Sequence, residues 1–215
     1  MCNKAEEKKK DVIEVEKKIF EFYKRIVYGT NYSRKGISEI TNIEQWCFYA
    51  AWKAMSQHTL HWENGKDEKG KFNKKKIVLD TYFAKKWPSI NNNDGIKSLI
   101  KDINDFLSKK VKGTNNVKSF SYGLAQKLVN MFFKHLYTFK DYDKQIANFD
   151  FSVCDCPVDS ITFERMAKDG YVHNGSSWSK LTENDYKEIQ NKIQTIVENS
   201  KGEYKSRFDY EFGWE

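Results

Sequence analysis

The sequence predicts an all-α fold, a compact multi-helix domain. Apolar residues recur at steps of three and four through much of the 215-residue chain, which is the spacing of one helix face. No long alternating strand pattern is present, and only two prolines interrupt the chain. A chain of this length commonly forms one domain with an adequate core. We therefore expect one helical domain over residues 1–215, with two helical lobes and a cleft between them as the alternative arrangement.

Two helices are expected in the N-terminal part of the chain. Residues 4–28 carry apolar side chains at helical spacing among charges, which is typical of a long amphipathic helix. Thr41 or Asn42 is expected to cap the next helix, which is rich in aromatic residues and runs to His58. Residues 64–73 are rich in Lys, Gly and Asp without periodicity, so they are expected to form a surface loop.

Helical spacing continues in the middle of the chain. Residues 77–86 and 95–109 each predict a helix, and the Trp87-Pro88 pair predicts a break between them. Residues 118–137 form the strongest helix candidate, because large apolar residues repeat there every four positions. The repeating residues are Leu124, Leu128, Phe132 and Leu136.

The C-terminal part predicts two further helices and a closing segment. Residues 141–151 are expected to connect elements, with a short helix among them. Asp159 is a candidate cap for the next helix, and Thr182 for a helix that runs through Val197. The mixed aromatic and charged tail, residues 204–215, is expected to lie as a strap over the body of the domain.

The net charge of the chain and the composition of its first residues indicate which partner and which location to expect. A formal net charge of +7 favours an anionic partner, although a lysine-rich surface that is merely solvated explains it equally well. The first ten residues are charged where a secretory signal needs an apolar run, so we expect a cytoplasmic protein. No apolar run is long enough to span a bilayer, so we expect no membrane partner.

The four cysteines do not have the spacing of a metal site. Only one C-x-C pair occurs, and no second pair would complete a set of ligands. We therefore expect reduced thiols, no bound metal and no cofactor. The cysteines are Cys2, Cys47, Cys154 and Cys156.

Two segments could carry chemistry, Gly123–Asn130 and Pro157–Arg165. The first has small residues four and two positions before Lys127, which allows close packing as a helix begins. The second is a helix-entry signal, because Asp159 can accept backbone N–H groups as an N-cap. One candidate amine nucleophile and one candidate carboxylate would therefore stand near the starts of two helices.

In this order, the two segments resemble the helix-hairpin-helix DNA glycosylase superfamily. Gly123, Ala125 and Lys127 match its hairpin and nucleophile positions, and Asp159 matches its carboxylate. Ala125 stands where the superfamily usually has a second glycine. Asp159 lies 32 residues after Lys127, an interval similar to that of the archaeal-type 8-oxoguanine DNA glycosylases. The matched motifs cover about a fifth of the chain.

The resemblance implies a DNA glycosylase with β-lyase activity that acts on double-stranded DNA as a monomer, with 8-oxoguanine as the first candidate base. Lys127 would attack the C1′ carbon of a nucleotide rotated out of the duplex, and Asp159 would stabilise the positive charge that develops on the sugar. Gly123 and Ala125 would contact the DNA backbone. An aromatic platform for the base is expected from tryptophans. The candidates are Trp46, Trp52 and Trp214.

Simpler structural roles stay open for these residues. Periodicity places Lys127, Asn130 and Lys134 on the polar face of their helix, where most lysines are only solvated. His135 is likewise expected at the helix surface. Capping alone could account for Asp159, at about 1 kcal/mol.

Two alternative functions also stay open. The first is a DNA-binding module that has the helical scaffold without catalysis, which Ala125 in place of a glycine would permit. The second is a helical protein-interaction domain with no nucleic-acid role, in which the first helix docks a partner.

Overall fold

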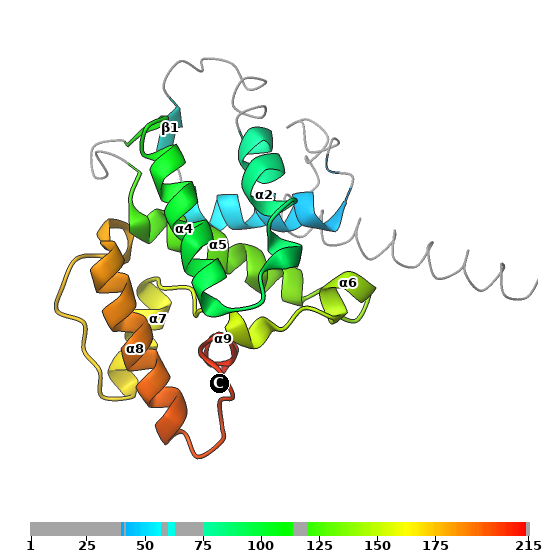
Figure 1. Cartoon of the computed structure of the whole chain (residues 1–215). Coiled ribbons are helices and arrows are strands. Elements are labelled where there is room, and N and C mark those ends of the chain that lie inside the picture. The colour runs from blue at the N-terminus through cyan, green and yellow to red at the C-terminus, as the bar shows by residue number, and fades with distance from the viewer. Residues whose placement is uncertain (1–39, 41, 57–59, 63–74, 114–119, 214–215) are drawn as a thin grey trace, which may run out of the picture.

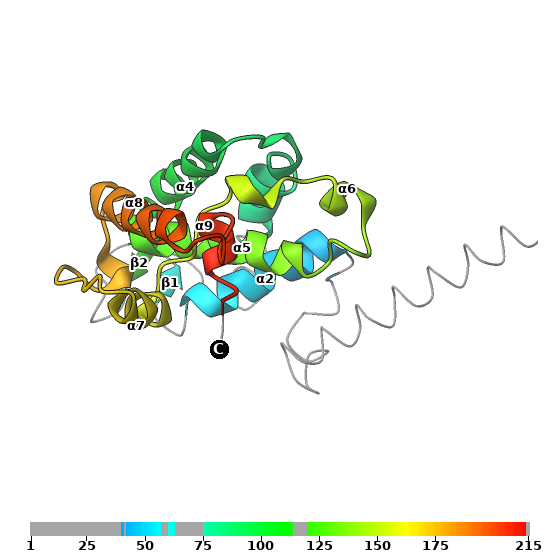
Figure 2. The same cartoon turned by 90° about the horizontal axis from the view of Figure 1, so that it is seen from below.

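Helix α5 (Tyr122–Tyr137) lies at the centre of the fold (Figure 1). The computed structural model describes residue 40 and residues 42–56, 60–62, 75–113 and 120–213. Side chains around nearly the whole circumference of α5 are buried, because other elements cover it on several sides. Helices α2 (Ile43–Ser56) and α4 (Asn93–Leu107) pack against α5, and the view from below places them on different sides of it (Figure 2).

Most of the remaining elements are helical, so the all-α prediction is confirmed. They are, in chain order, the π-helix η3 (Leu79–Phe83), η4 (Trp87–Ser89), α6 (Lys144–Ala147), η5 (Phe151–Val153), α7 (Ser160–Lys168), η6 (Trp178–Lys180), α8 (Glu183–Asn199) and α9 (Arg207–Tyr210). The strands of the described chain are β1 (Leu60–Trp62) and β2 (Val111–Gly113), which pair antiparallel with His61 opposite Lys112. Runs of three residues are too short to show an alternating pattern, so the sequence did not predict them.

Several helices begin at capping residues that the sequence predicts. The Asn42 side chain accepts a backbone N–H in the first turn of α2. Asp159 caps α7 in a capping box with Thr162, and Thr182 caps α8 in a second box with Asp185. These three predicted starts are confirmed. Helix α5 begins at its Ser121 cap, inside the predicted range.

The tail closes over the body as predicted, as far as it is described. Phe208 and Tyr210 of α9 are buried, and α9 contacts α8 and η5. The thiols of Cys47, Cys154 and Cys156 are free and buried, which confirms the prediction for these three. None of the helices in the described ranges has the length and apolar character that a membrane span needs. The predicted helix over 4–28, the predicted loop over 64–73, Cys2 and Trp214 lie outside the described residues.

Two expectations about α5 were wrong. Lys127 is 5% exposed and Asn130 is fully buried, although periodicity had placed both on a solvated face. His135 is half-buried, and its ring lies edge-on to Trp46 at a centroid distance of 5.5 Å. The reason is tertiary. Segments distant in sequence cover the polar face of α5 and supply partners for its polar side chains, and periodicity contains no information about them.

Candidate active site

An amine and a carboxylate meet between α5 and α7. Lys127 lies in the second turn of α5, and Asp159 is the N-cap of α7. The distance from Lys127 Nζ to Asp159 Oδ2 is 3.2 Å. The side chains are 7% and 19% exposed, so the ion pair is largely removed from water. The structure therefore brings together the two residues that the motif pair had singled out.

The two carboxylate oxygens of Asp159 have different partners. Oδ1 accepts the backbone N–H groups of Ile161 at 2.9 Å and Thr162 at 3.1 Å, which is the capping interaction. Oδ2 contacts Lys127. Capping therefore fixes the orientation of the carboxylate and leaves the second oxygen directed at the amine. Because the cap uses only one oxygen, capping alone does not account for the arrangement.

Trp178 of η6 covers the amine from another side. Lys127 Nζ lies 4.2 Å from the centroid of the half-buried Trp178 ring, which is a cation–π contact. The η6 backbone reaches this position because residue 123 is glycine: a Cβ atom there would lie 2.0 Å from the Trp178 carbonyl oxygen. The Gly123 N–H donates to the Leu181 carbonyl at 3.0 Å, which holds η6 against the start of α5.

The residues predicted to contact the DNA backbone are engaged inside the protein. The N–H of Gly123 is bonded to Leu181, and the N–H of Ala125 donates to the Ser121 carbonyl at 3.0 Å. Ala125 is fully buried. Neither N–H group is free to bind a phosphate in this conformation, so this geometry does not favour the predicted contacts, which stay predictions.

The loop that carries Asp159 is fixed by polar side chains from several helices. Asp155 is fully buried and accepts the Tyr186 hydroxyl at 2.8 Å and the Asn93 amide at 2.9 Å. Arg207 lies 2.9 Å from the same carboxylate. The Gln190 amide donates to the Cys156 carbonyl at 2.6 Å. A buried charge is costly without such partners, so these contacts stabilise this conformation of the loop.

A second amine–carboxylate pair lies beside the first. Lys134, seven residues after Lys127 on α5, forms an ion pair with Glu211, which is 9% exposed. Burial raises the pKa of Glu211, and the charge of Asp159 raises it further, while Lys134 opposes both effects. Burial also raises the pKa of the Cys156 thiol, which lies 3.6 Å from Glu211 Oε2. The charge of the partly buried Asp159 therefore acts on the buried carboxylate of Glu211.

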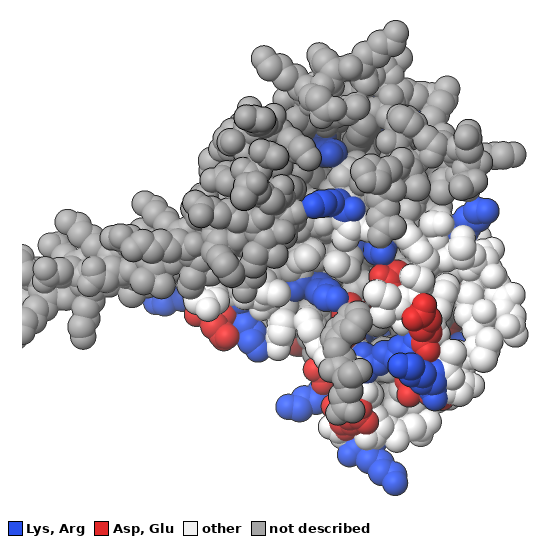
Figure 3. All heavy atoms as spheres, turned by 180° about the vertical axis from the view of Figure 1, so that it is seen from behind, with Lys and Arg blue, Asp and Glu red and all other residues white. Residues whose placement is uncertain are grey.

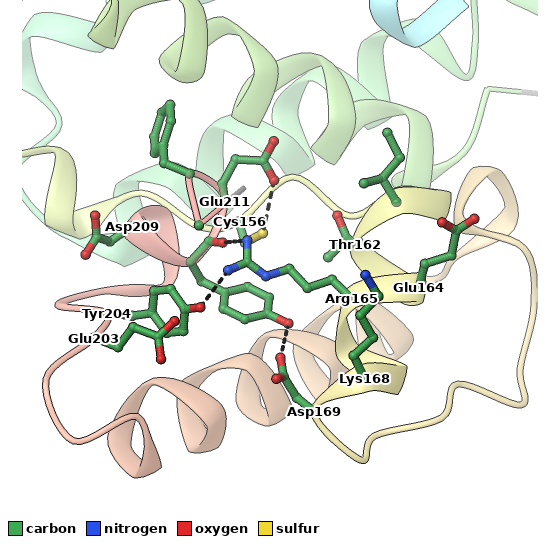
Figure 4. Close-up of a pocket in the computed structure, with 14 residues that line it drawn as sticks. Cys156, Thr162, Glu164, Arg165, Lys168, Asp169, Glu203, Tyr204, Asp209 and Glu211 are labelled. Atoms are coloured by element: carbon green, nitrogen blue, oxygen red, sulfur yellow. Dashed lines mark hydrogen bonds between the residues drawn. The ribbon is translucent and has the colours of Figure 1, made fainter. Parts of the chain in front are cut away.

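A cavity of about 740 Å³ opens between α7 and the segment 203–213. Arg165 lies in its wall and donates to the Tyr204 hydroxyl at 2.8 Å and to the Tyr210 carbonyl (Figure 4). Glu211 and Cys156 also line this cavity. Five lining residues are acidic and two are basic, so the cavity favours neutral or cationic groups over a phosphate. On the face seen in Figure 3, Lys and Arg likewise lie among Asp and Glu.

Two of the predicted base-pocket residues lie in the hydrophobic core. Trp46 is 2% exposed and packs edge-on against Phe139, and Trp52 is 4% exposed and packs against Phe48. The structure does not bring either ring to the Lys127–Asp159 pair. It places Trp178 there instead.

Sequence reasoning missed several residues of this region. Gln126, Asp155 and Glu211 have no local signal, because each binds a residue far away in the sequence. These partners are Val158, Tyr186 and Lys134. The one available signal was the spacing of Lys134, which falls on the same stripe of α5 as Lys127.

Within the described residues, no three His, Cys, Asp or Glu side chains are grouped to hold a metal ion. The reactive groups that the structure brings together in this region are amines and carboxylates. Comparisons of the chain with protein-family models, curated proteins and solved structures gave no significant match.

Proposed function

We propose that this protein is a DNA glycosylase with β-lyase activity, in which Lys127 is the nucleophile and Asp159 the stabilising carboxylate. The observation that carries the proposal is the 3.2 Å contact between Lys127 Nζ and Asp159 Oδ2, in which the lysine is buried and the carboxylate is partly buried. The motif pair that resembles the helix-hairpin-helix glycosylases consists of these two residues. A resemblance in sequence order alone does not require them to touch, so their contact supports the proposal.

The first chemical step is displacement of the base. A neutral Lys127 attacks C1′, the new C–N bond forms as the glycosidic bond breaks, and the departing base takes the electron pair and then a proton. The ammonium must first lose a proton, and the Asp159 carboxylate at 3.2 Å can accept it. Transfer of that proton from Asp159 to the departing base returns the carboxylate to its ionised form, which stabilises positive charge on the sugar.

The second step is cleavage of the strand. Opening of the sugar ring converts the amine adduct into an imine that links Lys127 to C1′. Loss of a proton from C2′ then lets the C3′–O bond break, and the 3′ phosphate leaves with the bonding electrons. Hydrolysis of the imine returns the free amine. Reduction of the imine by borohydride stops the sequence at a stable covalent adduct.

The cavity between α7 and residues 203–213 is the proposed place for the base; Thr162 of the Asp159 capping box lines it, whereas Lys127 and Asp159 do not. Its volume of about 740 Å³ is in the range of ligand sites. Its acidic lining suits the N–H groups of a purine better than the phosphates of the backbone. We propose double-stranded DNA with a modified base as the substrate, 8-oxoguanine as the first base to test, and a monomer as the active form.

The test is borohydride trapping on duplexes that carry 8-oxoguanine, uracil or an abasic site. The native protein is expected to form an adduct, Lys127→Ala none, and Asp159→Asn at a rate reduced about 100-fold. Lys85→Ala, which removes an exposed lysine, is the matched control and should trap like the native protein.

The other outcomes separate the alternatives. No adduct on any duplex together with salt-dependent DNA binding would overturn catalysis and favour a binding module. No DNA binding at all would favour a protein-interaction domain.

A further inference from the structure

The side chain of Gln126 uses every hydrogen bond that an amide can make. It is fully buried. Its Nε2 group donates to the carbonyls of Val158 at 2.7 Å and Gly123 at 3.0 Å. Its Oε1 atom accepts the Val158 N–H at 3.0 Å and the Asn130 amide at 3.3 Å. Two donors and two acceptor positions are thereby filled, which leaves the amide no alternative orientation.

Two of these bonds join Gln126 to both backbone groups of one residue. Val158 donates through its N–H and accepts through its carbonyl, so the amide holds the backbone as a neighbouring β-strand would. A contact with both groups restricts sliding as well as rotation of the Val158 peptide. The bond to Gly123 ties the same amide to the first turn of α5.

The two hydrogen bonds between the Gln126 side chain and the Val158 backbone, called the clamp from here on, lie next to the ion pair in the sequence. Gln126 directly precedes Lys127, and Val158 directly precedes Asp159. The clamp therefore joins the two chain segments one residue away from each member of the ion pair. A displacement of Val158 relative to Gln126 changes the distance between Lys127 Nζ and Asp159 Oδ2.

We propose that Gln126 is a positioning residue for the Lys127–Asp159 pair. Its amide sets the separation of the two reacting groups and thereby the rate of the chemical step, and it does not touch the DNA. This inference rests on the proposed glycosylase function where activity is the readout. Catalytic groups need placement within a fraction of an ångström, and a misplacement of about 1 Å costs about 100-fold in rate.

The experiment measures borohydride trapping in single turnover, with the protein in excess over an abasic or 8-oxoguanine duplex. Gln126→Met keeps the length of the side chain and removes all four bonds. Gln126→Glu keeps the acceptor and places a second acceptor against the Val158 carbonyl. Asn130→Ser removes the longest of the four bonds together with the Asn130 bond to the Tyr186 hydroxyl, and it is used if the other two variants do not fold.

We expect the trapping rate to fall about 100-fold for Gln126→Met and Gln126→Glu and about fivefold for Asn130→Ser, with the DNA dissociation constant within about twofold of native. Gln145→Glu, an exposed glutamine on α6, is the matched control and should leave the rate unchanged. Ile193→Ala creates a core cavity in α8 and controls for lost stability. At a temperature where it is folded, it should trap at the native rate.

A rate within twofold of native in folded Gln126→Met would overturn the positioning role. So would an equal loss of rate in Ile193→Ala, because a stability effect alone would then explain the result.

A second readout separates failure of this inference from failure of the proposed function. If the native protein traps no substrate, the glycosylase proposal fails, and NMR of the Lys127 ε-CH₂ and Nζ signals tests the clamp. Signals in Gln126→Met that move toward those of Asp159→Asn would support positioning by Gln126. Signals that stay at the native positions would contradict it.

Discussion

The nitrogen of Lys127 lies 4.2 Å from the centre of the Trp178 ring, so an aromatic side chain covers the proposed nucleophile before any substrate arrives. We predict that Trp178→Leu raises the rate at which acetic anhydride modifies Lys127 by about fivefold or more. The cation–π contact, worth about 0.5–2 kcal/mol, and its shielding are both lost. Peptide mass spectrometry measures the rate, with the exposed Lys85 in the same sample as the reference. An unchanged ratio of the two lysines would show that Trp178 does not protect the amine.

Gly123 allows the contact between α5 and η6. Gly123→Ala is expected to lower the free energy of unfolding by about 3 kcal/mol, because the added Cβ would lie 2.0 Å from the backbone oxygen of Trp178. Urea unfolding measures the change. Gly202→Asn is the control, since nothing lies near Gly202 and asparagine tolerates its positive φ of 94°. The control should lose less than about 1 kcal/mol, and an equal loss in both variants would contradict the steric argument.

The buried pair of Asp155 and Arg207 gives a third prediction. Asp155→Asn removes the charge that compensates Arg207, whose side chain is 17% exposed. We expect a loss of about 3 kcal/mol in the free energy of unfolding, as for other buried pairs deprived of one partner. Chemical denaturation checks this, and Asp105→Asn, at an exposed position of α4, should change stability by less than about 0.5 kcal/mol. A similar small change in Asp155→Asn would mean that water reaches Arg207.

His135 makes stability depend on pH. Burial, and secondly the charge of Lys134, lowers the pKa of His135 from 6.5 to about 4. The unfolded chain therefore binds a proton to this residue at a higher pH than the folded chain does. The contribution of neutral His135 to the free energy of unfolding is fully present above pH 6.5. It is lost as the pH falls toward 4, and the loss amounts to roughly 3 kcal/mol.

Thermal or urea unfolding across this pH range tests the effect of His135. Between pH 6.5 and 4, the free energy of unfolding of His135→Phe should depend less steeply on pH than that of the native protein. Ile193→Ala, which removes no titratable group, is the control and should keep the native slope. An unchanged slope in His135→Phe would contradict the linkage.

The sequence predicted those parts of the fold that depend on residues close together in the chain. Helix starts could be predicted from Asn42, Asp159 and Thr182, because a capping side chain accepts a backbone N–H only two or three residues later. The four-residue repeat that includes Leu128 gave helix α5. The short strands β1 and β2 were not predicted, because they pair across about 50 residues and neither has a pattern of its own.

The candidate site was predictable only in part. The motif resemblance named Lys127 and Asp159, which the structure brings into contact. It gave no indication that Trp178 covers the amine or that Gln126 holds Val158. Aromatic residues could not be sorted into core and site by type, and so Trp46 was assigned to a pocket although it is buried beside α5.

The loop that carries Asp159 draws its partners from both directions along the chain, and this sets the order in which the protein can be assembled. Asn93 and Gln126 precede the loop, whereas Gln190 and Arg207 follow it. Contacts of such long range form only when the intervening chain is present and collapsed. We therefore expect the Lys127 amine and the Asp159 carboxylate to reach their final spacing during synthesis only after α9 has left the ribosome.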